Sequence, residues 1–316
     1  MNQDVTNCPR CARPTPAARG ECIYCGEPLP FSRIQSAPPQ RNIDSAEHAF
    51  NTVLEPPRAA VNESVVVAFE SALQIEQADA RAMIGAGKPV PLARTQTRPE
   101  AEMIAALVRT CGLRATVIPD EELKLDDELL RARRIAITDE DFHVHHSGGE
   151  MIVKRADATL LVLGALQNTR VDYIEGISGT RGQSGSVLDS AEYRSEETLL
   201  DVYTAGLATS FQIKSDAFDY SGLVSPLSFR ADVNFRAAFE TLRHALPHAV
   251  VDDDFTRMKP LLDRAWPARA RNESRGFKRT GLAFRAVAQA SVISDNRDQF
   301  ERYSRLMCLS TARAQK

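Results

Sequence analysis

Four cysteines near the N-terminus constrain this chain more than any other sequence feature. They form two Cys-x-x-Cys pairs separated by ten residues. Zinc in proteins favours four deprotonated thiolates at the corners of a tetrahedron, and two such turns supply them. The spacing therefore predicts a small zinc-binding unit over residues 1–30, in which the Zn²⁺ ligands are Cys8, Cys11, Cys22 and Cys25. Free cysteines or a redox pair are the alternatives.

Four thiolates fill the coordination shell of the ion, so the predicted site is structural and keeps no position open for water. Gly26 suits the second turn, where the backbone often needs a positive φ. Ala12 follows the first pair, where glycine is common. Cys111 and Cys308 stand alone in apolar surroundings and are predicted to be buried, inert thiols.

The two cysteine turns resemble the short zinc ribbons at the start of many bacterial proteins. The chain as a whole resembles uncharacterised bacterial proteins with an N-terminal zinc ribbon. This resemblance implies a domain order and supplies no activity.

The remainder of the chain is long enough for two modest domains. Of the 316 residues, 43% are hydrophobic and 26% are charged, so a core can form without disulfides. The net charge of −3 argues against electrostatic nucleic-acid binding by the whole protein. Residues 1–7 show no secretory pattern, and the longest apolar run, 158–166, is far below the ~20 residues that span a bilayer. We expect a cytoplasmic protein without a membrane span, in which thiols stay reduced.

The first predicted segments after the cysteines are a linker and a helix. Residues 31–62 contain two Pro-Pro pairs among polar residues, which predicts a flexible linker with at most a short apolar contact at 49–54. Apolar residues then recur at helical spacing over 65–86.

Residues 63–125 are predicted to form this helix and a β-α-β unit. Thr97 and Glu100 have capping-box spacing, and Gly112 suits the end of the helix between strands 91–95 and 113–118. The stretch 90–123, with Pro99-Glu100-Ala101 and Gly112-Leu113, resembles the putative signal-transducing domains of bacteria. That resemblance implies a ferredoxin-like half and no catalytic residues.

Residues 126–250 are predicted to form an antiparallel β meander closed by a helix. Short alternating runs at 134–138, 142–146 and 151–155 are followed by longer ones at 159–166 and 169–175. Further strands follow at 199–204 and 210–214, and an amphipathic helix at 234–246. The hairpin around 135–144 and the closing helix resemble a bacterial PH-like domain, giving a fold class of α+β.

The C-terminal extension, 251–316, is predicted to be a basic α/β segment. Residues 257–285 hold nine Lys/Arg against Asp263 and Glu273, a net charge of +7, interleaved with Trp266, Phe277 and Phe284. Such a pattern suits binding to a nucleic-acid strand or to an anionic surface. The alternative is a charged loop whose side-chain stems cover the meander, or which pairs with the acidic half of the chain. The candidate nucleic-acid residues are Arg269, Arg271, Arg275, Lys278 and Arg279.

Two further clusters are predicted to be solvated. His143 and His145 share one face of a strand and could bind a divalent metal, but the sequence places no third ligand beside them. The acidic run 120–128 has six carboxylates with nothing to fix them around an ion.

No catalytic motif is present in the sequence. The glycine-rich residues 179–185 lack the Gly-Lys-Ser/Thr end of a P-loop, and no Gly-x-Ser-x-Gly elbow occurs. We therefore predict a non-enzymatic, zinc-binding cytosolic protein that acts as an interaction or regulatory module and has a protein partner. A regulator that binds nucleic acid weakly through 257–285, or an unrecognised enzyme with a deep polar pocket, is the alternative.

Overall fold

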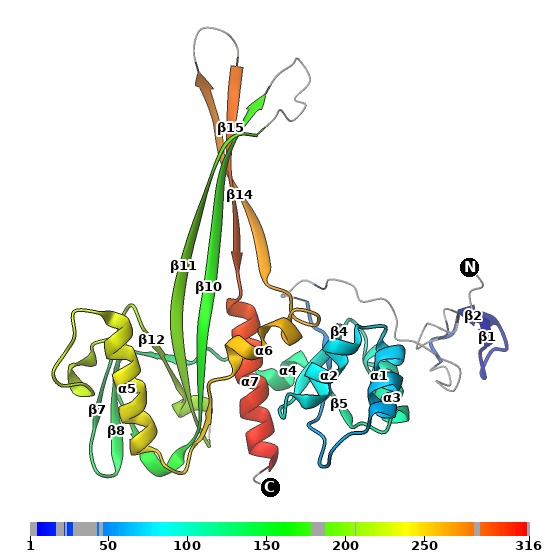
Figure 1. Cartoon of the computed structure of the whole chain (residues 1–316), viewed down its shortest axis with the longest axis horizontal. Helices are drawn as coiled ribbons and strands as arrows, with labels where there is room; N and C mark the ends of the chain where they lie inside the picture. The colour runs from blue at the N-terminus through cyan, green and yellow to red at the C-terminus, as the bar shows by residue number, and fades with distance from the viewer. Residues whose placement is uncertain are drawn as a thin grey trace. The chain divides into compact units, whose positions relative to one another are not determined.

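The computed structural model describes residues 5–16, 22, 24–27, 43, 47–177, 187–205, 207–280 and 285–314. Side chains at 5, 6, 16, 174–177, 187, 188, 274–280 and 285–289 lie outside that description. The chain is a mixed α+β protein, as predicted (Figure 1). It divides into two compact units. Unit 1 comprises Met1–Asp127, Arg257–Pro267 and Arg305–Lys316, and unit 2 comprises Glu128–Thr256 and Ala268–Ser304.

Unit 1 begins with a hairpin of β1 (Val5–Asn7) and β2 (Pro14–Pro16). Its larger sheet has the order β4-β3-β5, formed by β3 (Phe50–Leu54), β4 (Val90–Thr95) and β5 (Ala115–Pro119). Both outer strands are antiparallel to β3 and hence parallel to each other. The predicted β-α-β unit is therefore present, with β3 inserted between its two strands.

Strand β3 lies inside the predicted linker, so that prediction is wrong for residues 50–54. Asn51 and Thr52 are polar, yet both are buried in this strand. The Thr52 hydroxyl donates to the Ala101 carbonyl at 3.0 Å, which satisfies it inside the unit. Residues 31–42 and 44–46 of the predicted linker lie outside the described residues.

Two helices replace the single helix predicted over 65–86. They are α1 (Glu63–Leu73) and α2 (Gln77–Gly85). Gln74 ends α1 because it adopts a left-handed conformation with φ of 53°.

Helix α3 (Arg98–Thr110) agrees with its prediction. Thr97 and Glu100 form the capping box, and Gly112 has a φ of 83° just after the helix. The short α4 (Asp120–Leu123) follows β5.

A buried ion pair connects three parts of unit 1. Asp120 accepts from Arg94 Nη2 at 2.6 Å and from Asn51 Nδ2 at 2.8 Å. The other end of the Asn51 amide, Oδ1, accepts from Trp266 Nε1 at 2.8 Å. All four side chains are buried, so the acidic run 120–128 is not solvated at its first residue. Removing one partner of such a pair leaves an uncompensated buried charge.

Unit 2 contains a three-stranded meander and a seven-stranded sheet. The meander, β7 (Arg134–Ile137), β8 (Asp141–His146) and β9 (Gly149–Lys154), agrees with the prediction. The larger sheet has the order β14-β15-β10-β11-β12-β6, with β13 also beside β10. Its strands are β6 (Leu130–Ala132), β10 (Ala158–Ile177), β11 (Val187–Thr204), β12 (Phe211–Lys214), β13 (Val250–Asp252), β14 (Arg269–Thr280) and β15 (Arg285–Asp295).

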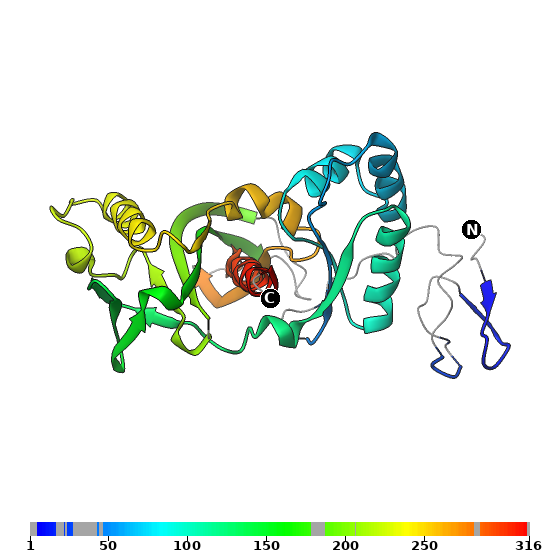
Figure 2. The same cartoon turned by 90° about the horizontal axis from the view of Figure 1, so that it is seen from below.

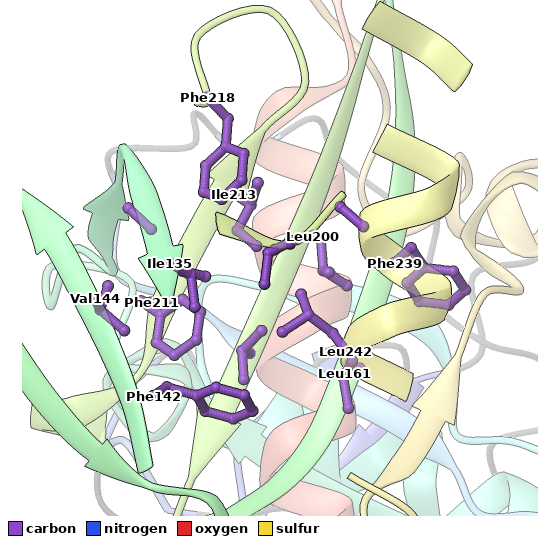
Figure 3. Close-up of a cluster of buried hydrophobic side chains, with 14 of the residues drawn as sticks. Ile135, Phe142, Val144, Leu161, Leu200, Phe211, Ile213, Phe218, Phe239 and Leu242 are labelled. Atoms are coloured by element: carbon purple, nitrogen blue, oxygen red, sulfur yellow. The ribbon is translucent and has the colours of Figure 1, made fainter. Parts of the chain in front are cut away.

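The core of unit 2 lies between the meander, the larger sheet and α5 (Ala231–Ala245), the predicted closing helix (Figure 3). Phe142 of the meander, Phe211 of β12 and Leu242 of α5 are all buried in it. Burial of these apolar side chains stabilises the short strands, because it removes apolar surface from water.

The predicted strands 159–166 and 169–175 are one continuous strand, β10. The predicted boundary at 250 falls inside its sheet, because β13 and β15 pair directly with β10. Residues 251–316 are therefore not a separate extension. Strand pairing between distant segments leaves no local signal in the sequence.

Helix α7 (Arg297–Ala314) contributes residues 297–304 to unit 2. Figure 2 views α7 (red) nearly along its axis. Phe300 lies over Gly164 of β10, where an added Cβ would be only 2.2 Å from the ring. The Ser304 hydroxyl donates to Asp201 at 2.6 Å and lies 2.8 Å from the Tyr203 hydroxyl.

Within the described residues, no helix combines the length and apolar character needed to cross a bilayer.

We predict that Gly164→Val destabilises unit 2 by about 1–3 kcal/mol, because the Phe300 ring must move out of its position. Gly85→Ala in α2 is the matched control, since nothing lies within 4 Å of the added Cβ, and it should stabilise by ~0.5–1 kcal/mol. Denaturant unfolding measures both. A Gly164→Val protein as stable as the wild type would show that the close packing is wrong.

Candidate metal centre

The four cysteines predicted from the sequence lie together. Sγ of Cys8 is 3.6 Å from Sγ of Cys25, and Sγ of Cys11 is 3.6 Å from Sγ of Cys22. All four sulfurs lie within 4.8 Å of one another, and none is in a disulfide. A tetrahedral ion with bonds of about 2.3 Å to sulfur requires sulfur–sulfur distances of about 3.8 Å. The arrangement thus has the dimensions of a four-thiolate metal site.

Two turns of the same construction hold the sulfurs. In the first, the Ala12 N–H donates to the Cys8 carbonyl, and in the second the Gly26 N–H donates to the Cys22 carbonyl, both at 2.9 Å. Ala12 and Gly26 have left-handed φ values of 56° and 70°. The positive φ expected for Gly26 is therefore present at both positions.

Backbone N–H groups also point at the sulfurs. The Arg10 N–H donates to Cys8 Sγ, and the Tyr24 N–H donates to Cys22 Sγ, each at 3.4 Å. A buried hydroxyl, that of Thr15, lies 3.5 Å from Cys22 Sγ. Donors directed at sulfur favour thiolate over thiol. The sequence analysis missed Thr15, because a threonine outside the Cys-x-x-Cys turns carries no recognisable signal.

The thiols affect one another's ionisation. The pKa of Cys22 is lowered from 9.0 to about 6, first by the hydrogen bond from Thr15, and then by the Tyr24 and Cys25 N–H groups against the effect of burial. For Cys25 the largest single effect is the Glu27 N–H, which lowers the pKa, but burial and hydrogen bonds with the other three sulfurs together raise it to about 12. The lowered pKa favours the thiolate of Cys22, whereas the raised pKa disfavours that of Cys25. A cation bound beside Cys25 would offset this effect.

Of the residues that the structure describes, these cysteines are the only group of three or more candidate ligands gathered this closely. They form a small buried cluster of their own. A metal held by all four would have a closed shell, which suits a structural role.

Glu150 lies beside the two histidines, a contact that the sequence alone could not predict. His143 Nδ1 lies 3.0 Å and His145 Nε2 3.6 Å from the same oxygen, Oε1 of Glu150. Strand register explains this, because His145 on β8 is paired with Glu150 on β9. All three side chains are substantially exposed, which agrees with the predicted solvated strand.

The predicted basic segment 257–285 is divided between the two units. Trp266 is buried and bonded to Asn51, so it cannot stack on a base. Arg264 is half-buried, and burial lowers its pKa. Arg269 and Arg271 are exposed on β14, whereas the side chains of Arg275, Lys278 and Arg279 lie outside the described ones.

Among the lone cysteines, Cys111 is buried and its pKa is raised by burial, as expected of an inert thiol. Cys308 is half-buried. No family model, curated protein or solved structure matches this chain.

We predict that Ala12→Gly tightens metal binding about fivefold, because it relieves a left-handed alanine that costs about 1 kcal/mol. Gly26→Ala is the opposite change and should weaken metal binding by a similar factor, because alanine is strained at the left-handed φ of 70°. No atom lies within 4 Å of the added Cβ, so this backbone strain is the only cost. Competition titration with a chelator, using Co²⁺ or Zn²⁺, measures both. Equal affinities for both variants and the wild type would contradict the shared turn geometry.

Proposed function

We propose that this chain is a zinc-binding, non-enzymatic protein of the cytoplasm that acts as an interaction module. The observation that carries the proposal is the set of four free thiols with tetrahedral spacing. Soft thiolates in a tetrahedron favour Zn²⁺ over harder cations. Free cysteines in this arrangement also suit a reducing compartment.

A ribbon of this kind supports interaction because metal binding fixes a small surface. Tyr24 is 52% exposed, and the Arg13 guanidinium lies 5.0 Å from the centre of its ring. Tyrosine and arginine are the residue types enriched where proteins meet. We place the contact with a protein partner on this pair, which metal binding holds in position.

A non-enzymatic role is supported by the chemistry of the polar groups. Four thiolates leave no coordination position for water or substrate. The hydrogen-bonded groups Asp201, Tyr203 and Ser304 are almost fully buried, where they stabilise the packing of α7 and cannot meet a substrate. An enzyme would require an accessible pocket with converging titratable groups.

We predict close to one zinc per chain in protein purified under reducing conditions. Cys22→Ser should release the metal, because three thiolates hold zinc less tightly than four and the Thr15 contact is lost with the sulfur. The melting of the main body should be nearly unchanged, since the cysteines form their own cluster. Elemental analysis and calorimetry measure the two effects. Less than half an equivalent in the wild type would refute the zinc site.

The partner is tested by capture from native lysate with quantitative mass spectrometry. Three baits are compared: the wild type, Cys22→Ser, and Tyr24→Ala. A partner of the ribbon surface should be lost with both variants, although Tyr24→Ala keeps its zinc. Proteins retained equally by all three baits would place the interaction elsewhere.

The nucleic-acid alternative is supported by one observation. The five candidate residues Arg269, Arg271, Arg275, Lys278 and Arg279 all lie on one strand, β14. If roughly three to five of them meet phosphates, the logarithm of affinity should fall against the logarithm of salt concentration with a slope of roughly −3 to −5. Reversing Arg269 and Arg271 should flatten that slope. No binding at low salt would exclude this alternative.

A further inference from the structure

Four strands extend from the body of unit 2 as a long arm (Figure 1). The arm consists of residues 168–177 of β10, 187–197 of β11, and strands β14 and β15. Every residue of 189–196 on one side and of 269–273 on the other is exposed. Successive side chains of a strand point to opposite faces. Residues 189–196 and 269–273 are therefore uncovered on both faces.

The arm has two open edges of nearly equal length. Among the described strands, β14 pairs only with β15, and residues 187–197 of β11 pair only with β10. These edges are 12 and 11 residues long, or roughly 37–41 Å at about 3.4 Å per residue. Each edge presents a row of backbone N–H and C=O groups that can pair with another strand.

The two edges carry opposite charge. Strand β14 has five basic residues against one acidic, a net charge of +4. The open part of β11 has the acidic residues Asp189, Glu192 and Glu196 against Arg194, a net charge of −2. Glu197 is left out of this sum because it is already paired with Lys214 and Arg297. Edge strands often carry charges that prevent them from pairing with another molecule. This protection requires that the two edges that would meet have charge of the same sign. Opposite signs on the two edges have the reverse effect, because they attract the unlike edge of another copy.

Strand direction is also compatible with pairing between copies. β11 and β15 are each antiparallel to β10, and β14 is antiparallel to β15. Strands β14 and β11 therefore run in opposite directions. When two arms lie side by side and point the same way, β14 of one meets β11 of the other as an antiparallel neighbour.

We infer that the arm is a self-association device in which β14 of one copy pairs with residues 187–197 of a second copy. The occupant of each edge is the same protein, selected by matching length, strand direction and opposite charge. Tyr193, 58% exposed on the open part of β11, adds an aromatic contact of the kind enriched at interfaces. This assignment concerns unit 2 and is independent of the function proposed for the zinc ribbon.

The two edges of the contact are different surfaces, so the association is heterologous. Each copy keeps one unused edge, and the assembly grows beyond a dimer until a ring closes or a chain extends. Association should weaken in about 1 M salt, where the Debye length is only about 3 Å.

The test uses full-length protein, treated with nuclease, and sedimentation velocity. Arg269→Glu with Arg271→Glu disables the β14 edge, and Glu192→Lys with Glu196→Lys disables the β11 edge. Each double variant alone should remain a monomer, whereas the wild type should form species larger than a dimer at low salt. An equimolar mixture of the two variants retains one native pair of edges. It should form 1:1 dimers and nothing larger.

The control for the β14 variant is Arg131→Glu with Arg236→Glu, which makes the same change in charge at two other exposed residues of unit 2. This control should associate like the wild type. Circular dichroism and melting confirm that each variant is folded. A wild type that stays monomeric at high concentration and low salt overturns the inference. So does a mixture that fails to form dimers, or an assembly that nuclease treatment disperses because nucleic acid bridged the arms.

Discussion

The pairing of strand β10 with its neighbours is the interaction on which unit 2 depends. β11 pairs with it almost from end to end, β13 joins near its start, and β15 pairs with its outer half. One strand therefore belongs both to the packed body and to the arm. Its inner residues Leu161 and Gly164 face opposite sides, one toward the core beneath α5 and the other toward α7.

Buried carboxylates fix the less regular segments in both units. Asp120 in unit 1 holds Arg94 and Asn51, and through Asn51 it holds the segment containing Trp266. In unit 2, Asp252 accepts from the Tyr303 hydroxyl at 2.9 Å, and Asp201 accepts from Ser304 of the same helix. Directional bonds of this kind specify one arrangement, because a shifted helix would break the bonds of Tyr303 and Ser304 to these buried carboxylates.

The candidate metal centre depends on local structure and not on contacts between distant segments. Its four sulfurs lie within 4.8 Å of one another, a spacing that suits a tetrahedral ion. The two turns share a backbone design, yet only one has the glycine that suits it. The site is thus a local structure set by two short segments, whereas the arm depends on four segments spread over more than a hundred residues.

The sequence by itself determined what local chemistry controls. It predicted that the four cysteines lie together, and it predicted the capping box at Thr97, the turn at Gly112 and the strands of the meander. Each of these depends on spacing within short stretches of chain. It failed for β3, where Asn51 and Thr52 are polar but buried, and for Asp120, whose partner Arg94 is distant in the chain. Only the tertiary structure decided that residues 269–295 belong to the sheet of β10, and that Glu150 lies between two histidines. Strand pairing and register depend on burial and hydrogen bonding between segments that are far apart in the chain. Spacing patterns among neighbouring residues therefore do not predict them.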